Sequence, residues 1–445
     1  MESVINSQTI STTRHRELTD RVNRFQATPT FIRVFILVAA GMFMDAIDVY
    51  LASGVSSYML ASKWSTMAQN STFLSAGFMG LFIGSITAGL VGDIFGRRRA
   101  YQLNLLIFGF FTLIEAFAPN MIFLIVCRLI AAIGLGTEIV TGYAMINEFA
   151  PIKQRGRWCA ATSLIANCGA PITMLMCTII IPRFSWRAMF VISGALALIL
   201  WYFRRNLPES PRWNINHHNY DEAEETIAMI EGEMKNKGPP QPISSNDRNH
   251  REERKRPSPD PEHDCCHCRR YRRYRLPVHL HLLGSNPVGS TGIEVTSSLG
   301  FSTVMMLGAP VGAFIGTTLV DKVGRKPTII SAFVLAAVLG IAYAYQTSSI
   351  GVMVIGFALT ACFYVLMAVV VAVYTSELFS TTYRFRGAGI ANGISKLVTI
   401  GMPYAVAWML TTVGSTTIFF TIAGMAIVAA TVVMIWGPET NQRVI

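Results

Sequence analysis

The chain has 445 residues, of which 52% are hydrophobic and 14% charged, and its formal net charge is +11. Soluble globular domains carry about 25% charged residues, so this composition argues against a soluble fold. A secreted disulfide scaffold, a collagen-like chain and a disordered chain are excluded as well. The positive charge favours Lys and Arg retained in cytoplasmic loops over a nucleic-acid partner.

Eleven apolar blocks follow a polar segment of 33 residues. Each block has roughly the 20 residues with which a helix spans a bilayer, so the sequence predicts a polytopic helical membrane protein. Small residues at four-residue spacing, such as Gly308, Gly312 and Gly316, indicate closely packed membrane helices. The blocks run over 34–55, 70–92, 101–118, 121–148, 158–182, 186–203, 296–320, 327–346, 350–374, 388–411 and 416–436.

The joints between these blocks alternate between basic and nearly uncharged. Basic clusters occur at 97–99, 155–157, 204–212, 325–326 and 384–386, whereas 119–120 and 347–349 carry no charge. The positive-inside rule places the basic joints and both termini in the cytoplasm. We therefore expect a multi-pass protein of a bacterial inner membrane or a eukaryotic plasma membrane.

The two halves of the chain repeat one another. The run DIFGRR at 93–98 recurs as DKVGRK at 321–326, and Glu148 with Arg155 has counterparts in Glu377 with Arg384. Duplicated halves of membrane helices are common in secondary transporters. The repeat therefore indicates a transporter built from two related halves.

Three motifs resemble the major facilitator superfamily. Gly89-x-x-x-Asp93-x-x-Gly96-Arg97-Arg98-Arg99 is similar to its loop motif after the second helix. The run PESPRW at 208–213 and the run PET at 438–440 resemble its sugar-porter and metabolite:proton symporter branch. The resemblance implies an all-α membrane protein of the major facilitator fold, with twelve helices in two six-helix halves.

These observations divide the chain into five parts. We expect a cytoplasmic N-terminal tail (1–33), an N-terminal six-helix half (34–203), a cytoplasmic central loop (204–263), a C-terminal half (264–436) and a cytoplasmic C-terminal tail (437–445).

One helix of the expected twelve is missing. Two spans must lie between the basic joints at 208–213 and 321–326, yet only 296–320 is apolar enough. The expected position of the seventh helix, 264–292, reads DCCHCRRYRRYRLPVHLHLLGSNPVGSTG, and each central Arg would cost several kcal/mol in a bilayer. A shift of the reading frame there can yield an apolar run for suitable codons, so we interpret the segment as a corrupted helix bracketed by compensating frame changes or a wrong splice. The alternatives are a metal site at 263–268 and a lipid-facing basic patch at 251–256 and 269–275.

Charged residues inside the apolar blocks are the candidates for proton coupling. Asp45 and Asp48 are three residues apart in the first helix and share a face. An ionisable group at membrane depth is costly and indicates a function. Asp48 resembles the first-helix aspartate of sugar porters, and Arg128 resembles their fourth-helix arginine, its usual partner; a structural ion pair is the alternative. Glu138, ten residues beyond Arg128, is a second proton site, a substrate contact or a packing residue.

The cytoplasmic charges resemble the family's inner charge network, which joins the halves when the site faces outward and separates when it faces inward. Topology signalling by positive charge is the alternative for its basic members. The predicted network comprises Asp93, Arg97, Arg98, Glu148, Arg155, Glu209, Arg212, Asp321, Arg325, Lys326, Glu377, Arg384, Arg386 and Glu439.

Substrate contacts are expected from polar and aromatic residues within the apolar blocks, namely Asn167, Asn392, Lys396 and Trp408. Lys396 shares a face with Asn392 and would meet an anionic substrate, unless it snorkels to the membrane surface.

The sequence thus predicts a secondary active transporter that moves a sugar or an organic or aromatic acid by proton symport and alternating access. The alternatives are a uniporter, a drug/proton exporter and a non-transporting nutrient sensor. No nucleophile, phosphate loop or cofactor motif indicates an enzyme, and we expect no metal and no cofactor. The expected partners are a small-molecule substrate, protons and the lipid bilayer, without nucleic acid, and the resemblance implies a monomer.

Overall fold

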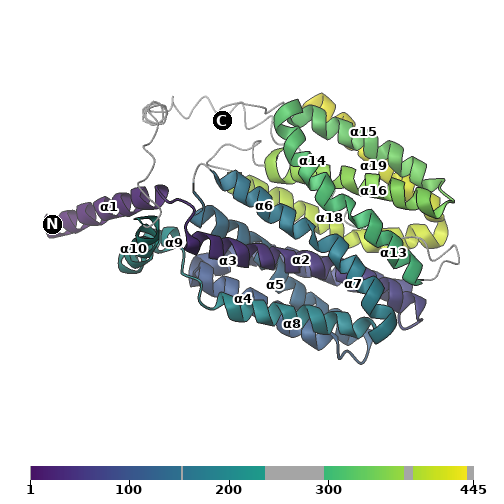
Figure 1. Cartoon of the computed structure of the whole chain (residues 1–445), viewed down its shortest axis with the longest axis horizontal. Helices are drawn as coiled ribbons and strands as arrows, with labels where there is room; N and C mark the ends of the chain where they lie inside the picture. The colour runs from purple at the N-terminus through teal and green to yellow at the C-terminus, as the bar shows by residue number, and fades with distance from the viewer. Residues whose placement is uncertain (1, 152–153, 236–294, 375–383, 438–445) are drawn as a thin grey trace.

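The computed structural model describes residues 2–151, 154–235, 295–374 and 384–437, and within these ranges every regular element is helical (Figure 1). Nine helical stretches in these ranges, some of which comprise parts of two consecutive helices, are long and apolar enough to cross a membrane. All eleven apolar blocks fall in helices, which confirms the prediction of an all-α membrane protein. The anomalous segment 264–292 and the alternatives attached to it lie outside the described residues.

The first group of helices begins with strong local signals. Thr28 caps α2, and Thr66 caps α3 in a capping box with Gln69. The group consists of α1 (Glu2–Asn23), α2 (Pro29–Ala61), α3 (Met67–Phe95), α4 (Arg97–Glu115), α5 (Met121–Phe149), α6 (Arg155–Asn167), α7 (Gly169–Phe184), α8 (Trp186–Arg204), α9 (Pro211–Asn216) and α10 (Tyr220–Lys235).

The second group repeats the turn that joins α3 to α4. Gly96 has φ 91° between α3 and α4, and Gly324 has φ 102° between α14 and α15. Both values lie in the region that glycine adopts without strain, so the repeated motif has a repeated conformation. The group consists of α13 (Val295–Met306), α14 (Gly308–Val323), α15 (Arg325–Ala344), α16 (Ser349–Leu366), the π-helix η4 (Met367–Tyr374), α18 (Arg384–Thr412) and α19 (Ser415–Trp436).

Two apolar blocks that the sequence presents as single spans are each divided into two helices. The block 158–182 forms α6 and α7, and the block 296–320 forms α13 and α14. Pro171 and Pro310 are the third residues of α7 and α14, respectively. Proline has no N–H with which to bond the carbonyl of the residue four positions earlier, so each helix is interrupted just before it. The interruptions fall at corresponding places in the two groups.

Glycines allow neighbouring helices to approach closely. A Cβ added at Gly136 of α5 would lie 2.8 Å from Leu81 Cα of α3, and one at Gly84 would lie 3.0 Å from Gly136 Cα. In the second group, a Cβ at Gly312 of α14 would lie 2.8 Å from Ala361 Cα of α16. The small residues therefore pack helices backbone to backbone in both groups, as their spacing predicts.

Hydrogen bonds join the two groups of helices at one end of the bundle. Ser75 of α3 donates to the carbonyl of Ile400 of α18 at 2.6 Å, and Ser71 donates to the carbonyl of Pro403 at 3.2 Å. These residues lie near the connection between α2 and α3, away from α1, α9 and α10, which gather at the opposite end (Figure 1). The two groups are thus closed against each other at the end that carries the α2–α3 connection.

The expected N-terminal tail and central loop contain helices that pack together. Arg14 of α1 donates to Asp221 of α10 at 2.7 Å, and Arg21 forms an ion pair with Glu231 at 2.8 Å. Leu18 of α1 is buried in the same apolar cluster as helix α10. Polar segments therefore form an ordered helical unit beside the bundle, because their few apolar residues share one face.

Substituting Gly136 with alanine is expected to lower stability by about 1–3 kcal/mol, because the methyl group would overlap the α3 backbone. The measurement is the thermal unfolding midpoint of the purified protein in detergent. The matched control is Gly340→Ala in α15, where a Cβ would have no atom within 4 Å. Equal midpoints for Gly136→Ala and the wild type would contradict the close packing of α3 on α5.

Candidate functional site

A buried ion pair lies at the centre of the first group of helices. Arg128 Nη1 of α5 donates to Asp48 Oδ1 of α2 at 2.7 Å, and Arg128 Nη2 lies 3.4 Å from the Asp48 carbonyl oxygen. The side chain of Asp48 is 0% exposed and that of Arg128 is 4% exposed. The structure therefore brings together the aspartate and arginine that the sequence singled out.

Helix α3 covers this ion pair with a glycine and an aromatic ring. A Cβ added at Gly77 would lie 3.1 Å from Arg128 Nε, so a larger side chain there would press on the guanidinium. The ring of Phe73 lies 5.6 Å from the guanidinium carbon and provides a cation–π contact. The pair is not saturated, because Asp48 Oδ2 and Arg128 Nε have no hydrogen-bond partner within the described part of the chain.

Asp45 faces the second group of helices. Its Oδ1 atom is buried without a hydrogen-bond partner among the described residues, and Lys396 of α18 exerts the largest electrostatic effect on it of any charged side chain. One turn further along α2, the Tyr50 and Tyr364 hydroxyls hydrogen-bond each other across the two groups. The contact of Tyr50 with Tyr364 thus joins α2 of the first group to α16 of the second.

Sequence reasoning missed Glu115, the last residue of α4. Its side chain is 0% exposed, and neither carboxylate oxygen has a hydrogen-bond partner in the described ranges. Arg128 exerts the largest electrostatic effect on it, followed by Asp48. The available signal was a single acidic residue inside the apolar block 101–118.

Glu138 belongs to a second buried ion pair. Arg204 donates to both of its carboxylate oxygens, at 2.7 and 3.0 Å, and donates to the Leu37 carbonyl oxygen at 2.8 Å. The Arg204 guanidinium also lies 3.9 Å from the centre of the Tyr101 ring. Arg204 belongs to one of the basic joints of the sequence, and its side chain is nevertheless 0% exposed. Two charge-assisted hydrogen bonds from Arg204 compensate the burial of this carboxylate.

Part of the predicted inner charge network forms within the first group of helices. Arg97 pairs with Glu148 at 3.2 Å, and the backbone N–H of Arg98 donates to Glu209 at 3.1 Å. Burial raises the pKa of Glu209, and the N–H groups of Ser210 and Arg98 counteract that rise. These contacts join α4, α5 and the segment after α8, all within the first group.

For the remaining residues of the predicted inner charge network, the structure describes fewer contacts. Arg155 begins α6 with two buried guanidinium nitrogens that have no hydrogen-bond partner in the described segments, and Arg212 donates to the Glu148 carbonyl oxygen at 3.3 Å. Arg325 and Lys326 begin α15. The side chains outside the described set are those of Asp93, Asp321, Glu377, Arg384, Arg386 and Glu439.

The weaker substrate candidates differ in position. Lys396 is partly buried and faces Asp45, whereas Asn167 ends α6 at the interruption before α7. Trp408 is 61% exposed and takes no part in the hydrogen bonds between the groups. The side chain of Asn392 lies outside the described residues.

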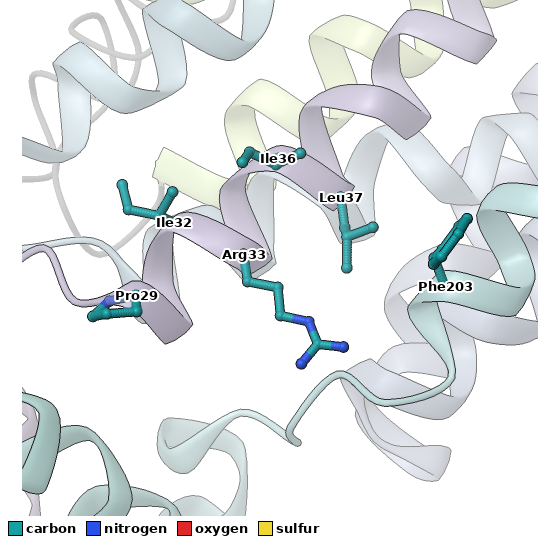
Figure 2. A pocket seen from close by; sticks show the side chains of 6 residues that line it. All are labelled: Pro29, Ile32, Arg33, Ile36, Leu37 and Phe203. Carbon is teal, nitrogen blue, oxygen red and sulfur yellow. The ribbon is translucent and has the colours of Figure 1, made fainter.

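A cavity of about 500 Å³ opens between the start of α2 and the end of α8 (Figure 2). Its lining consists of Pro29, Ile32, Arg33, Ile36, Leu37 and Phe203. Leu37 lies eight residues before Asp45, which corresponds to roughly 12 Å along a helix. The cavity is therefore separate from the carboxylates of Asp45 and Asp48.

Comparisons with known proteins agree on one family. A family model described as sugar (and other) transporters matches residues 31–445. The inner membrane metabolite transport protein YdjE of Escherichia coli K12 is 31% identical over 95% of this chain and 96% of its own length. The niacin transporter NiaP of Acinetobacter baylyi is 24% identical over 96% of this chain and 98% of its own.

A solved structure shares the fold. The partially occluded inward open conformation of the xylose transporter XylE from Escherichia coli has a TM-score of 0.72, with 18% identity over 93% of this chain and 99% of that chain. This similarity confirms the expected major facilitator fold.

Replacing Glu138 with glutamine is expected to cost about 3–5 kcal/mol, because it leaves the Arg204 charge buried without its counter-ion. The double variant Glu138→Gln/Arg204→Gln should recover part of that loss, which a double-mutant cycle of unfolding free energies measures. Arg205→Gln, at the exposed neighbouring position, is the control. Additive effects of the two substitutions would contradict the ion pair.

Proposed function

Because the chain belongs to the family of sugar (and other) transporters, we propose that it moves a small polar metabolite by proton symport and alternating access. Family membership and relatives make it a membrane transporter rather than an enzyme. The proposal of proton coupling depends on one observation, the fully buried ion pair between Asp48 and Arg128.

The pair links protonation to conformation. A guanidinium 2.7 Å from Asp48 stabilises the ionised carboxylate, and its withdrawal would allow the carboxylate to take up a proton. A neutral Asp48 no longer attracts Arg128, so the two helices that carry them are free to move relative to each other. Proton binding and the change between the two access states are then one linked equilibrium.

The pattern of contacts between the helix groups supports alternating access. The groups are hydrogen-bonded through Ser75 and Ile400 at the end with the α2–α3 connection, whereas the ion pair of Arg97 with Glu148 at the other end joins two helices of the first group. We propose that the site opens toward the end carrying α1, which the positive-inside rule makes cytoplasmic. In the opposite state, the inner charges would join the two groups.

Lys396 supports an organic acid as the substrate in preference to a neutral sugar. It makes no hydrogen bond or ion pair among the described residues, although it lies between the groups and acts on Asp45. A carboxylate is the ligand that best compensates a partly buried ammonium group in such a position. The relative named as a niacin transporter is consistent with this choice.

Asp48→Asn is expected to abolish accumulation against a gradient, because asparagine cannot carry the coupling proton. In proteoliposomes with an alkaline interior, a labelled panel that includes nicotinate, benzoate and xylose identifies the transported compound in the wild type. Asp48→Asn should then bring its accumulation ratio down to about 1 while exchange across equal pH is retained, since exchange needs no net proton movement.

The control for this experiment is Asp221→Asn, which removes an exposed carboxylate of α10. Wild-type accumulation by Asp48→Asn would contradict proton coupling at this residue. Uptake by the wild type that does not respond to the pH gradient would favour a uniporter, and outward movement would favour an exporter. A wild type that binds a compound of the panel without moving it would favour a sensor.

Lys396→Gln is expected to raise the KM for an acid substrate by about 10–100-fold, the equivalent of one lost hydrogen bond to a charged group. Lys396→Arg keeps the positive charge and should retain most of the affinity. Initial rates of uptake over a range of substrate concentrations give the two KM values. An unchanged KM in Lys396→Gln would show that the ammonium group does not hold the substrate.

A further inference from the structure

Glu115 is a buried carboxylate that the coupling pair leaves unexplained. It ends α4, is 0% exposed, and has neither oxygen hydrogen-bonded within the described part of the chain. Glu138, which is buried to the same degree, receives two hydrogen bonds from Arg204. A buried carboxylate in this bundle can therefore have hydrogen-bond partners, and Glu115 differs from Glu138 because it has none among the described residues.

The charged surroundings of Glu115 are few. Arg128 of α5 and Asp48 of α2 are the charged groups that act on it, and Glu115 in turn acts on the Cys127 thiol of α5. Arg187, at the start of α8, is engaged elsewhere, because it donates to the Ala118 carbonyl oxygen at 3.1 Å and stacks over an indole ring. Arg128 is therefore the cation that acts on both Glu115 and Asp48, although among the described residues it is hydrogen-bonded only to Asp48.

In this state the guanidinium is committed to Asp48, at 2.7 Å. An ionised carboxylate buried without a counter-ion or hydrogen bonds is too costly to persist, so a group in the position of Glu115 holds a proton. Arg128 still has capacity for a second acceptor, because its Nε–H has no partner in the described ranges. The centre therefore contains an ionised Asp48, a charged Arg128 and a neutral Glu115.

Resting on the proposed proton symport, we propose that Glu115 exchanges the coupling proton with Asp48 through a change of partner by Arg128. The proton leaves the Glu115 carboxyl group and is taken up by the Asp48 carboxylate. Arg128 at the same time moves from Asp48 to the newly ionised Glu115. The total number of protons and charges in the centre is the same before and after this step.

The position of Glu115 fits a proton arriving from the end at which the groups are closed. Glu115 lies at the end of α4 next to the α4–α5 connection, whereas Arg128 lies eight residues beyond Asn120, which caps α5. Eight residues correspond to roughly 12 Å of helix. Glu115 therefore lies nearer to the α4–α5 connection than Arg128 does.

Infrared spectroscopy of the reconstituted protein tests the proton on Glu115 without any substrate. At neutral pH, the wild type should show a carboxylic-acid C=O band that shifts in D₂O, and Glu115→Gln should lack that band. Asp221→Asn is the control, because it removes an exposed carboxylate of α10 outside the buried centre and should leave the band unchanged. Full retention of the wild-type band in Glu115→Gln would overturn the proposal.

The change of partner has a separate spectroscopic signature. Asp48→Asn removes an ionised group, so it has no carboxylic-acid band of its own to lose. It frees Arg128, however, and Glu115 should then ionise, so the Glu115 band should disappear in this variant as well. A Glu115 band that persists in Asp48→Asn would show that Arg128 does not change partner.

Transport separates failure of this inference from failure of the proposed function. With the compound that the wild type accumulates, Glu115→Gln should slow proton-driven accumulation by about 100-fold, as expected for loss of a positioned proton-transfer group, while exchange is retained. Normal accumulation by Glu115→Gln, together with loss in Asp48→Asn, would overturn the role of Glu115 and leave proton symport standing. Normal accumulation by both variants would overturn the proposed function itself.

Discussion

The cost of placing charge inside a bilayer governs the arrangement of this molecule. Arg128 and Arg204 are both buried, and each has a carboxylate at 2.7 Å. Their helices approach closely enough for such contacts because glycines occupy the crossing points, among them Gly77 over Arg128 and Gly41 beside Arg204. The ion pairs therefore depend on the glycines, because a larger residue where the helices cross would separate the charges.

The two ion pairs of the first group have different chemical capacities. Arg204 uses its donors on Glu138 and the Leu37 carbonyl, and Tyr101 covers its face. Arg128 keeps an N–H without a partner in the described part of the chain, and Asp48 keeps a carboxylate oxygen in the same condition. A fully hydrogen-bonded buried network is rigid, whereas unpaired buried polar atoms are energetically costly. The Asp48–Arg128 pair thus retains atoms that can bind a further partner, and this supports the proposed role of that pair in coupling.

Much of the fold could be predicted from the sequence, because membrane helices are long, apolar and locally determined. The pairing of Asp48 with Arg128 was also within reach, since both residues lie in motifs that resemble a known family. The pairing of Arg204 with Glu138 could not be predicted, because a charge at the end of an apolar block gives no sign of burial unless its tertiary partner is known. Glu115 was missed for the same reason, and the interruptions at Pro171 and Pro310 require the backbone to be seen.

The contacts between α1 and α10 have a consequence for how the protein is made. Arg14 binds Asp221 across 207 residues of sequence, and the apolar side of α1 is buried against residues of the same late segment. At a synthesis rate of about 5–20 residues per second, α1 would wait roughly 10–40 seconds for its partner to leave the ribosome. During that interval six apolar blocks are synthesised before Ala223, Ile227 and Ile230, the late residues of the cluster that buries Leu18. The contacts of α1 with α10 can therefore form only after those six blocks have been synthesised.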